Sequence, residues 1–300
     1  MLHLETLVGC SEKIEWCETI MLEIQGIGFP FFPEFSSCGK RKPKLFRWTR
    51  EQRDIQIYID HGIYDGLLNK KHNNKYGWFL ESRGVRSNLH QHIVDNLPCY
   101  KNAYKAMFTC DDQLVALDRS FFLKCLSASN MPWTIESECK IYPKSKRMSM
   151  ICSAVNMTPG HTRRLRWAEK LKDKLDLFGG ACGSRQIGVK SGEFYHHASK
   201  LDGLKDYMFS VAIENACYSD YFTEKITDCF ATGTIPIYIG NPSIGRHFNM
   251  DGIILLNKDT DLSGLNYDAY RERLHAIADN LERVVKMDIC EDGFVKDYLK

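Results

Sequence analysis

The sequence AIENACYSDYFTEKITDCFATGTIPIYIG, residues Ala212–Gly240, gathers two carboxylates, a phenol and an ammonium into a short polar segment. These groups belong to Glu214, Tyr221, Glu224 and Lys225. An apolar run that ends at a glycine follows, as expected of a buried strand. A capped surface helix with exposed charges would explain the pattern. A site for a nucleoside diphosphate would explain it as well.

Strand-like and helix-like segments alternate around this stretch. The second half predicts an amphipathic helix over Arg163–Leu175, with Thr162 as its N-cap, and a helix over Tyr221–Gly233, capped by Ser219 or Asp220. Predicted strands are Asp54–Asp60, Lys75–Ser82, Ala103–Cys110, Met148–Val155, Leu175–Gly180, Tyr207–Asn215, Ile235–Gly240 and Asp251–Asn257, and Tyr267–Lys300 is mostly helical. This alternation with short connections is typical of parallel sheets. We therefore predict a Rossmann-like second half and a second such domain before it.

A basic, polar segment, Cys139–Arg147, separates the two halves and reads as a linker. The predicted domains are residues 1–143 and 144–300. The aromatic segment Gly28–Phe35 is broken by two prolines, which favours a loop or edge element. The sequence leaves open whether Phe29–Phe35 plugs the first domain or covers an acceptor cleft.

Composition excludes several classes of protein. The 300 residues carry a formal net charge of only +2, which gives no whole-chain argument for nucleic acid or an anionic membrane. The 12 cysteines form no CxxC or zinc-ligand pattern, which favours reduced thiols in a cytoplasmic protein. No signal peptide and no apolar run of membrane-spanning length is recognisable.

The residue types in the opening stretch suit a nucleotide-sugar site. A helix N-terminus stabilises phosphate, and a lysine such as Lys225 in its first turn adds a full positive charge. Glu224 would accept ribose hydroxyls and Tyr221 would stack on a base. Arg163 and Arg164 open the preceding predicted helix, so a guanidinium is expected at an equivalent strand end. Arginine and lysine converging on one diphosphate would stabilise it as a leaving group.

The segment from Ser153 to Phe248 resembles the α-1,3/4-fucosyltransferases of glycosyltransferase family 10. The similarity is carried by IENACYSDYFTEK, TIPIYIGNPSI and SAVNMTPGHTRRLRWAEKL, and the bacterial members are the most similar. In the first half the best anchor is WFLESRG, Trp78–Gly84, which resembles an aromatic run ending in Glu-Ser-Pro in that family. Arg83 stands here in place of the proline, which puts the geometry of that loop in doubt.

The resemblance implies a GT-B fold: two facing Rossmann-like domains, with the nucleotide-sugar site in the C-terminal one. It implies an inverting enzyme in which Glu81 is the general base. Arg164 and Lys225 would hold the diphosphate, and Tyr221 the guanine. Hydroxyl contacts are implied for Glu214 and Glu224, with weaker donor-site assignments to Asn215 and Ser243. No metal is required by such a mechanism, and Asp259–Asp261, an Asp-x-Asp sequence, reads as a turn.

The function predicted on this basis is transfer of a hexose, L-fucose from GDP-fucose, to a hydroxyl of a glycan acceptor. The sequence leaves two alternatives open. One is a transferase of the same fold that uses another nucleotide sugar on a modified DNA base, a lipid or a protein. The other is a catalytically silent glycan-binding module.

Overall fold

Two parallel β-sheets form the framework of the computed structural model, which describes residues 21–28, 36–38, 41–134, 136–183 and 197–299. The first sheet has the order β2-β1-β3-β4-β5-β6 and the second β11-β10-β9-β7-β8. The strands of the first sheet are β1 (Leu22–Ile27), β2 (Phe46–Thr49), β3 (Ile55–Ile59), β4 (Lys75–Trp78), β5 (Ala106–Thr109) and β6 (Phe122–Lys124). Those of the second are β7 (Lys146–Ile151), β8 (Asp176–Phe178), β9 (Tyr207–Ile213), β10 (Ile235–Ile239) and β11 (Ile254–Leu255).

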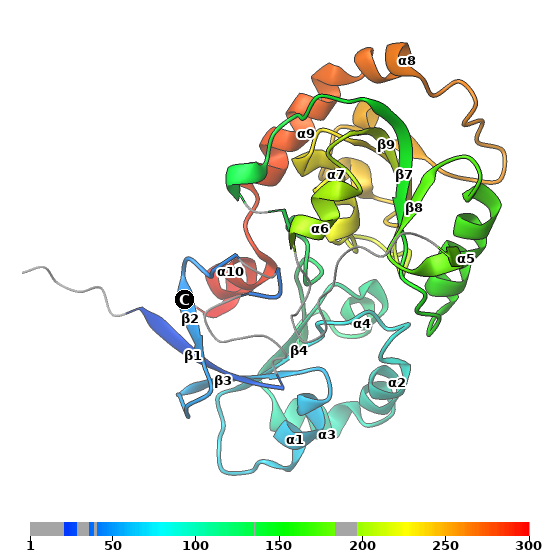
Figure 1. Ribbon diagram of the computed structural model, residues 1–300. Helices are drawn as coiled ribbons and strands as arrows, with labels where there is room; N and C mark the ends of the chain where they lie inside the picture. The colour runs from blue at the N-terminus through cyan, green and yellow to red at the C-terminus, as the bar shows by residue number, and fades with distance from the viewer. Residues whose placement is uncertain (1–20, 29–35, 39–40, 135, 184–196, 300) are drawn as a thin grey trace, which may run out of the picture.

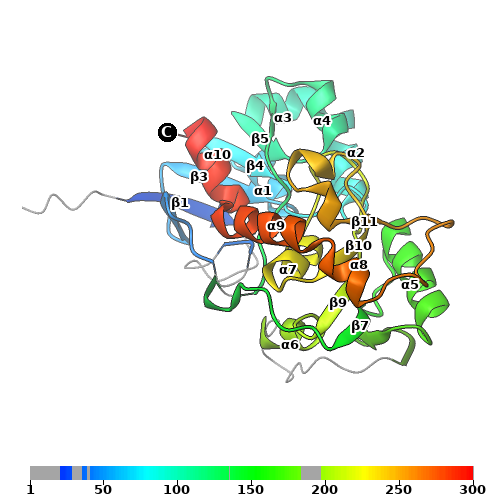
Figure 2. The same cartoon turned by 90° about the horizontal axis from the view of Figure 1, so that it is seen from above.

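Helices connect the strands and cover the sheets. In the first half they are α1 (Gly62–Leu68), α2 (Ser87–Asp95), α3 (Leu97–Ala103) and α4 (Asp112–Leu117). In the second half they are α5 (Pro159–Leu171), α6 (His197–Asp202), α7 (Glu224–Ala231), α8 (Tyr267–Arg271), α9 (Leu274–Lys286) and α10 (Cys290–Phe294). A π-helical turn, Val295–Leu299, follows α10. Figures 1 and 2 show the two α/β units, with α9 leading from the second back to α10 beside the first.

Both faces of the first sheet are apolar. Successive side chains of a strand point to opposite faces, and each face is buried in a core. On β3, Ile57 and Ile59 point to one core and Tyr58 to the other. Tyr58 packs in the core covered by α1 and α3. On the opposite face, Phe294 of α10 stacks on Phe108 of β5, with ring centres 4.4 Å apart. The end of the chain therefore completes the core of the first sheet.

The second sheet follows the same rule. Ile235 and Ile237 of β10 lie in one core, and Tyr238 lies in the other. The first core is covered by α5, through Ala168 and Leu171, and the second by α7 and the end of α9. The predicted class of two parallel-sheet α/β units in a GT-B-like arrangement is confirmed. The division at residues 143 and 144 stays a prediction.

Two predicted helix starts are wrong. Helix α5 begins at Pro159 rather than Arg163, and its N-cap is Thr158 rather than Thr162. Proline is suited to a first helical position because it needs no hydrogen-bond acceptor there. Helix α7 begins at Glu224 rather than Tyr221. Asp220 has a φ of 62°, a left-handed conformation that a right-handed helix does not admit.

The predicted linker, Cys139–Arg147, is not a free connection. The amide of Lys140 donates to the carbonyl of Ala231, at 3.0 Å. The ammonium of Lys144 donates to the Thr232 carbonyl at 2.8 Å and to Thr234 Oγ1 at 3.0 Å. This segment is therefore fastened to the C-terminal end of α7. The aromatic segment Phe29–Phe35 lies outside the described residues.

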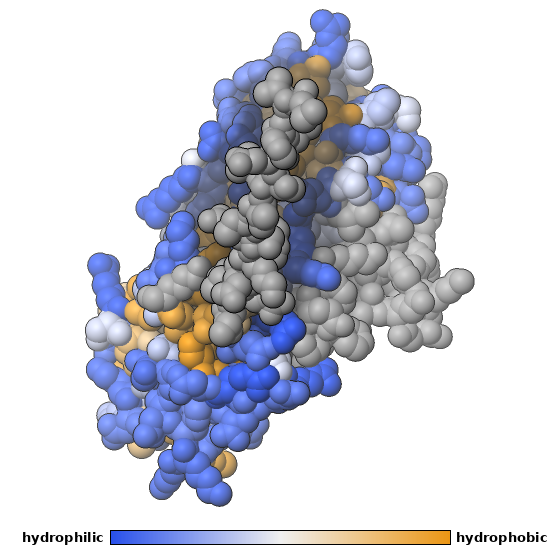
Figure 3. Space-filling model, turned by 90° about the vertical axis from the view of Figure 1, so that its left-hand side faces the viewer, coloured by the Kyte–Doolittle hydropathy of each residue, from blue (hydrophilic) through white to orange (hydrophobic). Residues whose placement is uncertain are grey.

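Within the described ranges, no helix is both long and apolar enough to cross a membrane. The described part of the face drawn in Figure 3 is mostly hydrophilic, with an apolar patch at the lower left of the view. The Asp-x-Asp sequence forms the predicted turn. Asp259 donates its amide to Asn257, and the carboxylate of Asp261 accepts from Ser263.

Candidate active site

A cavity of about 480 Å³ lies between the two sheets and receives side chains from both halves of the chain. Leu80, Glu81 and Val85 come from the loop that follows β4. Strands β7 and β9 and helices α5 and α7 supply part of the remaining wall, and the loops around them supply the rest. The predicted site residues that line the cavity are Glu81, Arg164, Asn215, Tyr221, Glu224 and Lys225. Parallel sheets place such sites at the carboxyl ends of their strands.

Glu81 is held at the cavity by Asp60. The Asp60 carboxylate accepts from the amides of Leu80, at 3.0 Å, and Glu81, at 3.3 Å. It also accepts from Nε of Arg86, at 3.1 Å. Burial and the nearby Asp60 charge raise the pKa of Glu81, and Arg86 and Lys225 only partly offset them. A raised pKa at the end of a strand suits a general base.

Arg83, where the family resemblance leads one to expect proline, crosses to the other domain. Its guanidinium lies 3.3 Å from the carboxylate of Asp111 and over the ring of Tyr218, 5.5 Å from the ring centre. The Asp111 carboxylate also lies 3.2 Å from Nε2 of His90. Arg83 thus connects the loop after β4, which carries Glu81, with Tyr218 in the segment that precedes α7.

Arg164 is buried in the wall of the cavity. Its Nη1 donates to Oδ1 of Asn215 at 3.3 Å, and its Nη2 donates to Oγ of Ser153 at 3.0 Å. Its Nε is buried with no hydrogen-bond partner among the described residues. An unpaired buried guanidinium N–H is costly, and an anion in the cavity would satisfy it.

The start of α7 gathers charged groups at the cavity. Thr223 caps the helix by accepting from the amide of Lys225. The ammonium of Lys225 lies 3.0 Å from Thr223 Oγ1 and 3.3 Å from Glu224 Oε1. Burial works to raise the pKa of Glu224, but Lys200 and then Lys225 lower it to about 2. Glu224 is therefore ionised, and Lys225 is held at a helix N-terminus that faces the cavity.

Glu214 is buried beneath this helix start and does not line the cavity. Its carboxylate accepts from the amide of Thr223 at 2.9 Å and from Thr223 Oγ1 at 2.7 Å. The structure therefore turns the Glu214 oxygens to the helix start and does not bring this residue to the cavity, and its contact with donor hydroxyls stays a prediction. Ser243 is not brought to the cavity either. It lies outside the cavity lining, where its amide and hydroxyl donate to Asn241.

Tyr221 reaches the cavity wall, but its ring is only 4% exposed. It packs on Tyr218 with ring centres 5.0 Å apart, and beside Cys110 of the first domain. A ring buried in this way offers no open face to a nucleobase. The structure therefore argues against the predicted stacking on guanine and places Tyr221 in the interface between the domains.

Among the lining residues that sequence reasoning missed are Trp133, His161, Lys200 and Asp228. His161 follows the cap of α5, and burial lowers its pKa, helped by Arg164 and Lys225. Lys200 belongs to α6, in a segment that the sequence did not predict as a helix. In retrospect, the position of His161 just before the Arg163–Arg164 pair could have indicated that it lies at the cavity. No spacing rule singles out Lys200.

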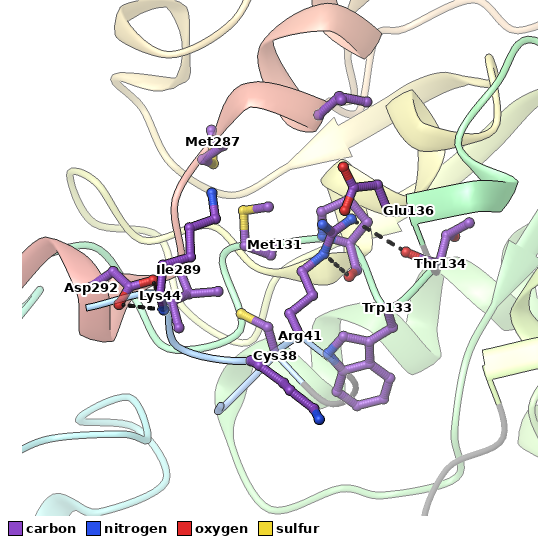
Figure 4. Close-up of a pocket in the computed structure, with 13 residues that line it drawn as sticks. Cys38, Arg41, Lys44, Met131, Trp133, Thr134, Glu136, Met287, Ile289 and Asp292 are labelled. Atoms are coloured by element: carbon purple, nitrogen blue, oxygen red, sulfur yellow. Dashed lines mark hydrogen bonds between the residues drawn. The ribbon is translucent and has the colours of Figure 1, made fainter. Parts of the chain in front are cut away.

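A smaller cavity, of about 240 Å³, lies between Cys38, residues 41–44, residues 131–134 with Glu136, and the junction of α9 and α10. Figure 4 shows Arg41 and Trp133 at this cavity, and Arg41 donates to the carbonyls of Pro132 and Thr134. Trp133 lines both cavities. Across the described ranges, no group of three or more His, Cys, Asp or Glu side chains is arranged to hold a metal ion.

Residues 143–258 match the model of the C-terminal part of glycosyltransferase family 10 (fucosyltransferase). The segment is similar to that part of the family, and we call it the family 10 domain below. It contains Arg164, Glu224 and Lys225, whereas Glu81 lies in the part of the chain before it.

Curated relatives of the chain include fucosyltransferases matched over short segments. One is an α-(1,3)-fucosyltransferase of Helicobacter pylori, 42% identical over 55 residues, which are 18% of this chain and 12% of the relative. Another is α-(1,3)-fucosyltransferase B of Drosophila melanogaster, 51% identical over 74 residues, 23% of this chain and 17% of the relative. The matched segments thus span less than a fifth of the length of either relative.

A solved structure extends the likeness in fold to almost the whole chain. A crystal structure of an α1,3-fucosyltransferase with GDP aligns with 94% of this chain and 95% of its own, at a TM-score of 0.50 and 15% sequence identity. At that identity the match bears on the fold alone. The first domain, whose sequence resembles the family only weakly, therefore has the architecture expected of it.

Proposed function

We propose that this chain is an inverting fucosyltransferase that transfers L-fucose from GDP-fucose to a hydroxyl of a glycan acceptor. One observation carries the proposal. A single cavity joins Glu81 of the first domain to Arg164, Glu224 and Lys225 of the family 10 domain. A transferase needs a base for the acceptor and cations for a departing diphosphate in one enclosed space.

The residues divide between the two halves of the reaction. Glu81 would take the proton of the acceptor hydroxyl as its oxygen attacks the anomeric carbon of the sugar. The bond from that carbon to the diphosphate breaks on the opposite face, so the configuration inverts and GDP leaves. Arg164 and Lys225 would meet the charge that develops on the diphosphate. Glu224, ionised at the N-terminus of α7, would accept hydrogen bonds from the ribose hydroxyls.

A thermal-shift screen of the purified chain with GDP, UDP, CDP and the common sugar nucleotides tests the donor. A ligand that binds the folded state and not the unfolded state raises the melting temperature, and the rise grows with the logarithm of its concentration relative to Kd. We expect selective stabilisation by GDP and GDP-fucose. Selective stabilisation by another nucleotide would contradict fucose as the sugar transferred. No shift with any of them would favour a silent module with the same fold.

A further inference from the structure

Lys200 lines the cavity, although the sequence predicted no role for it. Its ammonium lies 2.7 Å from Oδ2 of Asp228 and 3.2 Å from Oε1 of Glu224. It also sits over the ring of Trp133, 4.3 Å from the ring centre. Only 15% of the side chain is exposed. A lysine so enclosed loses rotamer freedom, which its contacts must offset.

The charges around α7 explain what this lysine does. Three carboxylates, those of Glu214, Glu224 and Asp228, lie buried at or beneath the first turns of the helix. An anionic donor would be repelled by them, since like charges in a partly desolvated site interact strongly. Lys225 contacts Glu214 and Glu224, at 3.8 Å and 3.3 Å, but no such contact joins it to Asp228. Lys200 supplies the cation for Asp228 and the second cation for Glu224.

Asp228 also ties this group to the segment that contains Trp133 and Thr134, which precedes the predicted linker Cys139–Arg147. Its Oδ1 accepts from the amides of Trp133, at 2.8 Å, and Thr134, at 3.0 Å. On its other side the same segment borders the smaller cavity of Figure 4. Lys200 therefore connects the cavity side of α7, through Glu224 and Asp228, with the segment that contains Trp133.

We infer that Lys200 is a positioning residue for donor binding: it fixes the Glu224 carboxylate where that group receives the ribose hydroxyls. The inference rests on the proposed function, because it presupposes that GDP binds in this cavity. Lys200 acts through Glu224, so its removal should be felt by the ribose hydroxyls rather than by the whole nucleotide.

A ligand-truncation experiment isolates this effect. Dissociation constants for GDP and 2′,3′-dideoxy-GDP are measured by calorimetry on the wild type and on Lys200→Met, Lys200→Gln, Lys200→Arg and Lys205→Met. Lys205 is the matched control, since it lies nearby with a side chain 41% exposed and only a 4.0 Å contact to Asp202. The wild type should prefer GDP by about tenfold or more, the scale of hydrogen bonds to a charged group. That preference should fall to about threefold or less in Lys200→Met and survive in Lys200→Arg and Lys205→Met.

The outcomes separate the two proposals. If the wild type binds neither nucleotide, the proposed function fails. If the wild type prefers GDP and Lys200→Met keeps the full preference, the role of Lys200 is overturned. Equal affinities in the wild type also overturn it, because Glu224 would not then be reading the ribose. Should Lys200→Met fail to give a cooperative melt, Lys200→Gln, which keeps donors but loses the charge, provides the same comparison.

Discussion

Two carboxylates of the cavity, those of Glu81 and Glu224, have opposite electrostatic surroundings. Burial and Asp60 raise the pKa of Glu81. For Glu224 burial acts in the same direction, but Lys200 and Lys225 outweigh it and lower the pKa to about 2. Environments that separate the pKa values of two acids in one site usually indicate that the acids have different roles. The raised one suits proton transfer, and the lowered one suits a permanent hydrogen-bond acceptor.

The pH dependence of turnover follows from Glu81. A base acts in its ionised form, so kcat/KM of the wild type should fall as pH decreases through the pKa of Glu81. Because that pKa is raised, the midpoint of the acidic limb should lie above the ordinary value of 4.5. The measurement is the initial rate of GDP release across pH. A midpoint at or below 4.5 would contradict the assignment.

The affinity for GDP depends on Lys225. Lys225→Ala should weaken GDP binding by about 1.5–3 kcal/mol, because a charge-assisted contact to the diphosphate is lost. Calorimetric titration measures the loss. Lys172→Ala is the control, since that exposed lysine pairs with Glu169 at the C-terminal end of α5, away from the cavity lining. If GDP affinity is unchanged in Lys225→Ala, the diphosphate binds elsewhere.

At the scale of elements, the start of α7 links fold and site. Thr223 caps the helix and also carries the buried carboxylate of Glu214. The sequence predicted the strands β9 and β10 and a helix between them, because their apolar patterns are long and regular. It did not predict the first residue of α7, since that depends on the left-handed backbone of Asp220, which no periodicity reveals. Lys225 was predictable from its place at a helix start. Arg164 lies in the second turn of α5, and it was singled out by the Arg163–Arg164 pair and by the family resemblance. Lys200 was not, because its role arises only from packing against Asp228 and Trp133.

Removal of the α7 cap should destabilise the fold. Thr223→Ala should lower the free energy of unfolding by about 1–2 kcal/mol, the usual effect of losing an N-cap hydroxyl. Thr223→Ser keeps the hydroxyl and should stay close to the wild type. Urea denaturation followed by circular dichroism measures both. Equal stability of Thr223→Ala and the wild type would show that the cap does not contribute to the stability of the fold.

For the whole molecule, the end of the chain fastens the two domains together. Glu291 of α10 accepts from the amide of Ser37 at 2.6 Å and from its hydroxyl at 3.0 Å, across 254 positions of sequence. Asp292 accepts from the amides of Lys44 and Leu45. Local patterns predicted helices in this tail, but contacts at such separation leave no signal in spacing. The return of α10 to the first sheet was therefore not predictable.

Glu291 should make stability depend on pH. Burial is the main cause that raises its pKa, to about 7, from an ordinary value of 4.5. The folded state then binds more protons than the unfolded state between pH 4.5 and 7, so stability should fall as pH rises through that window. One group contributes a slope of at most about 1.4 kcal/mol per pH unit. Urea titrations at several pH values, compared with Glu291→Gln, isolate this slope. An identical pH dependence in both proteins would contradict the effect.

The most direct test of the account is the release of GDP from GDP-fucose by the wild type and by Glu81→Gln, with GDP affinity measured on the same samples. Transferases of this kind usually pass the sugar slowly to water when no acceptor is present. The account predicts release by the wild type, release at least about 100-fold slower in Glu81→Gln, and GDP affinities within about twofold of each other. Equal release rates, or parallel loss of release and GDP binding, would contradict Glu81 as the base at a cavity shared by the two domains.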